Sequence, residues 1–111
     1  MTPRRLLVPT PDRGEVWLAD LGMAAKVRPC LVLSVPPEPQ HRVLTTLVPH
    51  TTSVQGTRFE VALPKRFLKA GAFDAQGLVT VAQARLLRRL GKLQPSELAL
   101  VEEAVKRWLG L

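Results

Sequence analysis

The chain has 111 residues, of which 46% are hydrophobic and 23% charged, and this composition excludes a disordered chain and suits one folded domain. Its net charge of +7 favours a polyanionic partner such as nucleic acid. The single cysteine excludes an internal disulfide and fits a reducing cytoplasm, and no apolar run is long enough for a secretory signal or a membrane span.

In chain order, the pattern predicts an arm, several short strands and a terminal helix. Residues 1–12 carry three prolines and no periodicity, which predicts a flexible N-terminal arm before a single domain at 13–111. The predicted strands are 14–21, 28–35, 42–49 and 57–63, with one further strand or a pair of short strands within 77–87. Of these, 57–63 has the clearest alternation, and 65–73 could hold one short helical turn.

The C-terminal segment predicts an amphipathic helix at about 95–109. Pro95 suits the first helical position, and Leu98, Val101, Val105 and Trp108 recur at helical spacing. Short strands separated by about ten residues, with proline and glycine turns, are typical of a small barrel. The predicted fold class is therefore mainly β, a small barrel with a C-terminal helix.

Few motifs in this chain carry chemistry. His41, His50 and Cys30 lack the spacing of metal ligands, and no glycine-rich phosphate loop is present, so we expect no metal and no cofactor. Cys30 lies within "PCLVLS" and is predicted to be a small buried hydrophobe rather than a nucleophile.

Arg28 stands at the start of an apolar strand, directly before Pro29. The residue before a proline favours extended backbone, and a proline can begin a strand without donating a ladder hydrogen bond. Arg28 could therefore be a functional cation at the open end of the strand. It could equally be a structural residue that pairs with Asp20 or another carboxylate.

The segment "VPHTTS", 48–53, follows the third predicted strand. Its hydroxyls, its histidine and its backbone could bind a phosphate. The alternative is a turn with local side-chain to backbone hydrogen bonds.

Several segments occur in a fixed order: "RGEVWLADLG", "RPCLVLS", "VPHTTS…GTRFEVALP", "GLVTVAQARLL" and a terminal helix. This order resembles that of the MazF/PemK family. The resemblance spans about 13–109. It implies an SH3-like barrel of the CcdB/MazF/PemK toxin type, usually a homodimer. It also implies a cognate antitoxin, whose acidic disordered tail would lie across the basic groove.

The family's activity is metal-independent, sequence-specific cleavage of single-stranded mRNA. The 2′-hydroxyl attacks the adjacent phosphorus and leaves a 2′,3′-cyclic phosphate and a 5′-hydroxyl. The resemblance assigns the catalytic arginine to Arg28 and the catalytic threonine to Thr51. It assigns the RNA groove to Thr52, Ser53, Gln83 and Arg85.

The chain departs from the family in the segment between "DLG" and "RP", which here is only "MAAKV". Many members have a longer loop there, some with a catalytic glutamate that nothing here replaces. His50 is a candidate for proton transfer because its ordinary pKa lies near neutrality, and Lys26 is a further RNA-binding candidate.

Aromatic residues make up only 5% of the chain, and Trp17 and Trp108 lie in apolar patterns. We therefore expect base choice to depend on hydrogen bonds and groove shape rather than on stacking. Two rival functions remain: a gyrase poison of the same fold, and an RNA-binding barrel that has lost its activity.

Overall fold

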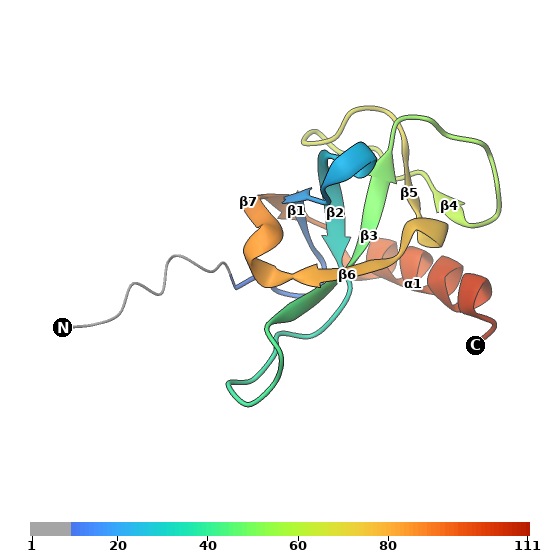
Figure 1. The fold of residues 1–111 in the computed structure, drawn as a ribbon. Helices are drawn as coiled ribbons and strands as arrows, with labels where there is room; N and C mark the ends of the chain where they lie inside the picture. Colours follow the sequence, from blue (N-terminus) through green and yellow to red (C-terminus); the bar gives the residue numbers. More distant parts are fainter. Residues whose placement is uncertain (1–9) are drawn as a thin grey trace.

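The computed structural model describes residues 10–111 (Figure 1). The strands are β1 (Glu15–Asp20), β2 (Val27–Val32), β3 (Leu44–Thr51), β4 (Glu60–Val61), β5 (Ala72–Asp74), β6 (Val79–Ala82) and β7 (Leu86–Lys92). Three short 3-10 helices, η2 (Met23–Ala25), η3 (Ala75–Gly77) and η4 (Gln83–Arg85), lie between strands. The helix α1 (Pro95–Leu109) has the predicted bounds.

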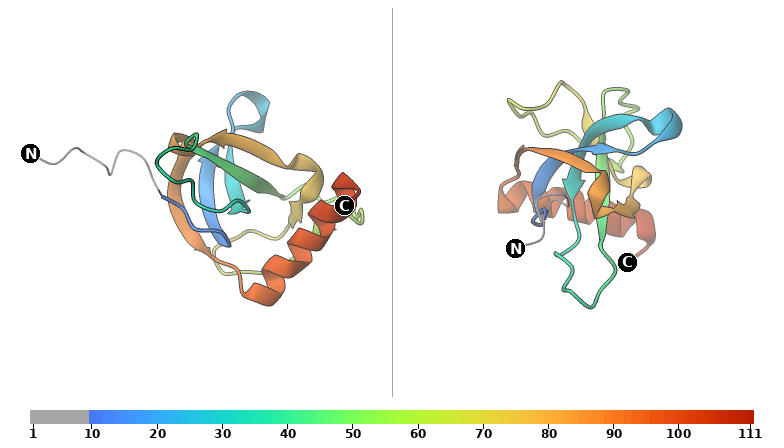
Figure 2. Two further views of the ribbon diagram at one scale, coloured as in Figure 1. Left: turned by 90° about the horizontal axis from the view of Figure 1, so that it is seen from below. Right: turned by 60° about the vertical axis from the view of Figure 1, so that its left-hand side comes forward.

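The seven strands form one antiparallel sheet in the order β4-β5-β3-β2-β1-β7, and β6 pairs with β3. β3 is long enough to pair with β6 through Leu44–Leu47, with β2 through Leu47–Pro49 and with β5 through His50–Thr51. The mainly β class with a terminal helix is confirmed. The strands curve around the core as expected of a small barrel, although within residues 10–111 the hydrogen-bonded sheet is not closed (Figure 2).

Two hydrophobic clusters lie on opposite faces of the central strands. On one side Leu31 and Val48 pack against Phe73 and the helix residues Val101 and Ala104. On the other side lies a smaller cluster of Ala19, Cys30, Val32, Leu47 and Leu86. Successive residues of a strand face opposite sides, so a strand with both faces covered is apolar throughout. This explains the near-continuous apolar run of β2.

The helix α1 crosses one face of the sheet (Figure 2). Its first turn has a reciprocal capping box, in which Gln94 N–H donates to Glu97 Oε1 at 2.8 Å and the Gln94 side chain accepts from the Glu97 N–H. Lys65 forms an ion pair with Glu97 at 2.6 Å, which ties the loop before β5 to the helix.

Two predicted segments, 57–63 and 65–73, differ from the structure. The alternation at 57–63 persists as half-buried Phe59, Val61 and Leu63, but only Glu60–Val61 forms a strand, because its partner β5 is three residues long. Residues 65–73 contain no helix but a turn closed by the Leu68 N–H on the Lys65 carbonyl.

The predicted arm falls largely on residues 1–9, which lie outside the described residues. Its last part belongs to the folded domain, because Pro11 is buried and the Asp12 N–H donates to Glu15 Oε1 at 2.8 Å. Among residues 10–111, no helix is both long and apolar enough to cross a membrane.

Candidate active site

Arg28 is the second residue of β2 and pairs with Ala19 of β1. The next residues of the strand lead into the core, where Cys30 and Leu31 are fully buried. Because the core fixes this strand, the backbone of Arg28 is held in a defined position. Asp20, the carboxylate that could have paired with Arg28, instead accepts a hydrogen bond from the Gly22 N–H at 2.9 Å. Arg28 forms no ion pair with any residue of 10–111. A half-buried arginine without a carboxylate partner suits an external anion.

Cys30 is a buried core residue, as predicted. Burial raises the pKa of its thiol to about 12, although the nearby charge of Arg28 lowers it. The thiol is therefore protonated at neutral pH and is a poor nucleophile.

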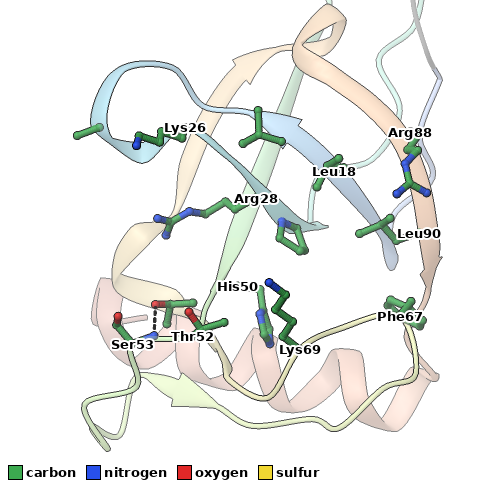
Figure 3. A pocket seen from close by; sticks show the side chains of 14 residues that line it. Leu18, Lys26, Arg28, His50, Thr52, Ser53, Phe67, Lys69, Arg88 and Leu90 are labelled. Atoms are coloured by element: carbon green, nitrogen blue, oxygen red, sulfur yellow. Dashed lines mark hydrogen bonds between the residues drawn. The ribbon is translucent and has the colours of Figure 1, made fainter.

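The residues of "VPHTTS" form the end of β3 and the turn after it. The Ser53 N–H donates to Thr51 Oγ1 at 3.0 Å, so the turn has the local side-chain bond that the alternative interpretation expected (Figure 3). This bond uses the hydroxyl of Thr51 as an acceptor and leaves its own O–H able to donate to a ligand. The turn and the phosphate-binding interpretation are thus compatible.

His50 precedes this turn and is buried, with its ring edge-on to Phe73 at a centroid distance of 5.1 Å. Burial lowers the pKa of His50 below its ordinary value of 6.5, so the imidazole is neutral at pH 7. The loop before β5 holds this part of β3 closely. A Cβ at Gly71 would lie 2.1 Å from the Thr51 carbonyl oxygen and 2.7 Å from His50 Cε1.

A pocket of about 530 Å³ joins these elements. It is lined by Leu18, Ala24, Lys26, Val27, Arg28, Pro29, His50, Thr51, Thr52, Ser53, Phe67, Lys69, Arg88 and Leu90. Four of these residues are cations, and none is a carboxylate. Such a pocket attracts and holds an anion.

The pocket brings together six of the eight predicted site residues, namely Lys26, Arg28, His50, Thr51, Thr52 and Ser53. Gln83 and Arg85 lie elsewhere. Gln83 is buried and accepts a hydrogen bond from Thr45 Oγ1 at 3.3 Å, and it is not among the residues that line this pocket. Arg85 is exposed on η4, with its guanidinium near Gly22 at the base of the loop that carries Lys26.

The sequence analysis did not single out the other lining residues, which include Phe67, Lys69 and Arg88. The cluster of cations in "KRFLK" was a signal for Lys69, but that segment was interpreted as a helical turn. Arg88 lies opposite Leu18 in the β1–β7 pairing. The run "RRLGK" gave no sign that it would reach the same pocket.

Among residues 10–111, no group of three or more histidines, cysteines or carboxylates could hold a metal ion. The residues that line the pocket offer guanidinium, ammonium and hydroxyl groups that can bind an anion, and one neutral imidazole able to exchange a proton.

Residues 12–109 match the family model described as PemK-like, MazF-like toxin of type II toxin–antitoxin system. The chain belongs to this family and is a toxin of that class. Its fold is similar to that of MazF from Deinococcus radiodurans, with 28% identity over 93% of this chain and 99% of that chain and a TM-score of 0.77.

Two complexes match with the same TM-score. One is MazE–MazF from Deinococcus radiodurans, with 26% identity over 93% of this chain and 98% of that chain and a TM-score of 0.77. The other is an endoribonuclease with its cognate antitoxin from a mycobacterial species, with 27% identity over 91% and 96% and a TM-score of 0.77.

Proposed function

We propose that this toxin is an endoribonuclease that cleaves single-stranded mRNA at a short recognition sequence, without a metal ion or cofactor. The observation that carries the proposal is the basic pocket in which Arg28, unpaired within residues 10–111, shares one cavity with the hydroxyls of Thr51, Thr52 and Ser53. The family membership and the similar mycobacterial endoribonuclease support it.

The proposed reaction begins with the 2′-hydroxyl of the RNA. Its oxygen attacks the adjacent phosphorus, the bond to the 5′-oxygen breaks, and the products are a 2′,3′-cyclic phosphate and a 5′-hydroxyl. Because the nucleophile already belongs to the substrate, positioning supplies much of the rate gain. The remaining requirement is stabilisation of charge on the non-bridging phosphoryl oxygens.

Arg28 is the residue suited to that charge, because a guanidinium is permanently ionised and has several donors in a fixed plane. Its position at the end of a core strand keeps the donors in place before substrate binds. Thr51 is proposed to hold a phosphoryl oxygen in line for the attack. Lys26, Thr52 and Ser53 would bind the RNA backbone, and the exposed Arg85 would contact RNA outside the pocket.

His50 is the proposed proton-transfer residue. A neutral imidazole can accept the proton of the attacking 2′-hydroxyl, and the imidazolium can return a proton to the departing 5′-oxygen. Burial keeps the resting ring neutral because it lowers the pKa of His50. The short "MAAKV" segment lacks the glutamate that some family members use. No carboxylate lines the pocket that could take over its role.

The proposed partners are an antitoxin and a second copy of the chain, in the cytoplasm. The similar structures include MazF bound to MazE. An acidic, disordered antitoxin tail would bind the basic pocket, become ordered there and exclude RNA.

The test is cleavage of a long single-stranded RNA pool in excess EDTA, with every 5′ end mapped. We expect cuts at one short motif, 5′-hydroxyl ends, and a loss of roughly 10²–10⁴ in rate for Arg28→Ala. Arg28→Lys should recover only part of this rate, because an ammonium lacks the planar donors. Lys106→Ala removes an exposed helix cation and is the matched control.

Wild-type rates in a folded Arg28→Ala variant would contradict the assignment of Arg28. If folded wild type bound RNA without cutting it, the chain would be an RNA-binding domain. Gyrase inhibition without RNA cleavage would identify a poison of the same fold.

A further inference from the structure

The pocket has two chemically different ends (Figure 3). Lys26, Arg28, Thr52 and Ser53 lie at one end, which is basic and hydroxylated. At the other end are Phe67 and Leu90, with Arg88 beyond them, and Leu18 lies between the two ends. The first end suits a phosphate, whereas the apolar surface of the second has no use in the cleavage chemistry proposed above.

Phe67 is held firmly although it belongs to the loop between β4 and β5. Its ring packs directly on the backbone of β7, because a Cβ at Gly91 would lie 2.4 Å from Phe67 Cε2 and 2.7 Å from Cζ. The residue is only half-buried and packs against the main hydrophobic cluster from the pocket side. An aromatic ring is therefore presented to the cavity at a fixed place.

A nucleobase is the occupant that fits this end. Every base has a flat π face that stacks on an aromatic ring, and its sugar is linked to the phosphates that the basic end attracts. A cavity of about 530 Å³ takes roughly one or two nucleotides. A base at the apolar end therefore belongs to a nucleotide next to the phosphate held by Arg28.

We propose that Leu18, Phe67 and Leu90 form a subsite for one base adjacent to the scissile phosphate, with that base against the Phe67 ring. This inference rests on the proposed function and adds a specificity-determining residue to it. It also revises the expectation, based on the low aromatic content, that base choice depends only on hydrogen bonds and groove shape.

The test measures binding rather than cleavage. The probe is a short RNA that carries the mapped cleavage motif, with a 2′-deoxy sugar at the cut so that no nucleophile is present. Versions with an abasic residue at each position in turn are titrated against wild type and Phe67→Leu, which keeps an apolar side chain but removes the ring. Phe59→Leu is the matched control, because Phe59 is also half-buried but contacts Trp108 outside the pocket.

We expect one position next to the cut at which loss of the base weakens wild-type binding about tenfold. Phe67→Leu should weaken binding of the intact RNA by a similar factor and be insensitive to the abasic residue at that position. Phe59→Leu should respond to the abasic series as wild type does. A double-mutant cycle of this form isolates the contact between ring and base.

Two results would overturn the subsite. One is a wild-type abasic series without a sensitive position beside the cut, which is decisive even if Phe67→Leu folds poorly. The other is that the abasic residue weakens RNA binding equally in wild type and in folded Phe67→Leu. This holds also if Phe67→Leu weakens the binding of the antitoxin alone. If wild type still cleaves the RNA and folded Arg28→Ala does not, the proposed function stands and only the subsite fails. If folded wild type neither binds nor cleaves RNA, both fail.

Discussion

His50 combines burial with a position on the wall of a cationic pocket. Lys69, Arg28 and the other pocket cations line the same cavity, so a proton on His50 would add charge where no carboxylate offsets it. Burial lowers the pKa of His50 and so favours the neutral ring in the native protein, and this has a measurable effect on stability.

We predict that the free energy of unfolding falls as the pH is lowered through and below 6.5. The lowered native pKa of His50 means that the unfolded chain binds the proton first, so acid favours unfolding in this range. Urea titrations between pH 7.5 and 5 should show a smaller decline for His50→Gln than for wild type. His41→Gln, which changes an exposed histidine, is the control. An identical decline in wild type and His50→Gln would contradict the prediction.

Gly71 shapes the site without lining the pocket. Its replacement by alanine would place a methyl group 2.1 Å from the Thr51 carbonyl oxygen, so the end of β3 or the loop must shift. We expect Gly71→Ala to lower the free energy of unfolding by about 2 kcal/mol or more and to reduce cleavage. Thermal unfolding and a cleavage assay measure the two effects.

The control is Gly56→Ala, at a site with no atom within 4 Å of the added Cβ but with a φ of +74°. Only backbone strain of about 1 kcal/mol is expected there. Equal destabilisation by the two substitutions would show that close packing at Gly71 is unimportant.

At the scale of elements, the first turn of α1 is where the helix is joined to the rest of the fold. Glu97 accepts the Gln94 N–H and pairs with Lys65. These interactions, with the hydrogen bond from Lys65 foremost, lower the pKa of the Glu97 carboxyl. The Glu97 side chain thus accepts a backbone N–H at the start of the helix and also anchors the loop that leads to Phe67 and Lys69.

We predict that Glu97→Ala lowers the free energy of unfolding by about 1 kcal/mol at pH 7, mainly through loss of the cap. Glu103→Ala removes an exposed carboxylate from the same helix and should change stability by less than about 0.5 kcal/mol. Urea denaturation of the three proteins provides the comparison. Equal stabilities of wild type and Glu97→Ala would refute the anchoring role.

At the scale of the whole molecule, the fold gathers cations from separate segments into one pocket that has no carboxylate in its lining. Lys69 and Arg88 are distant in sequence from each other and from Lys26 and Arg28, yet all four line one pocket. Cations that meet phosphates release condensed counterions, so binding through this pocket must depend on salt.

We predict that Lys69→Ala and Arg88→Ala each reduce the slope of log affinity against log salt concentration for single-stranded RNA by about 0.7. Lys106→Ala removes the same charge from the exposed face of α1 and should leave the slope unchanged. Titrations at a series of salt concentrations measure the slopes. An equal change in all three variants would mean that net charge, rather than this pocket, determines binding.

Local patterns in the sequence determined much of the architecture. The helical spacing of Leu98, Val101 and Val105 predicted α1 with its observed bounds, and the apolar run after Pro29 predicted a strand, which the fold buries on both faces. Arg28 and the turn after β3 were also recognisable, because a polar group next to a core strand is an unusual local feature. In each case the signal lies within a few residues, where backbone conformation and burial are encoded.

Only the tertiary structure decided how distant segments meet. It shortened 57–63 to a two-residue strand, buried Gln83, and brought Phe67, Lys69 and Arg88 to the pocket with Arg28. None of these has a local signature, because each depends on which strands pair and on what packs against them. The strand that carries Arg28 can thus be predicted from the sequence. The cations and the ring around it are determined by the pairing of β7 with β1 and by the packing of the β4–β5 loop on Gly91.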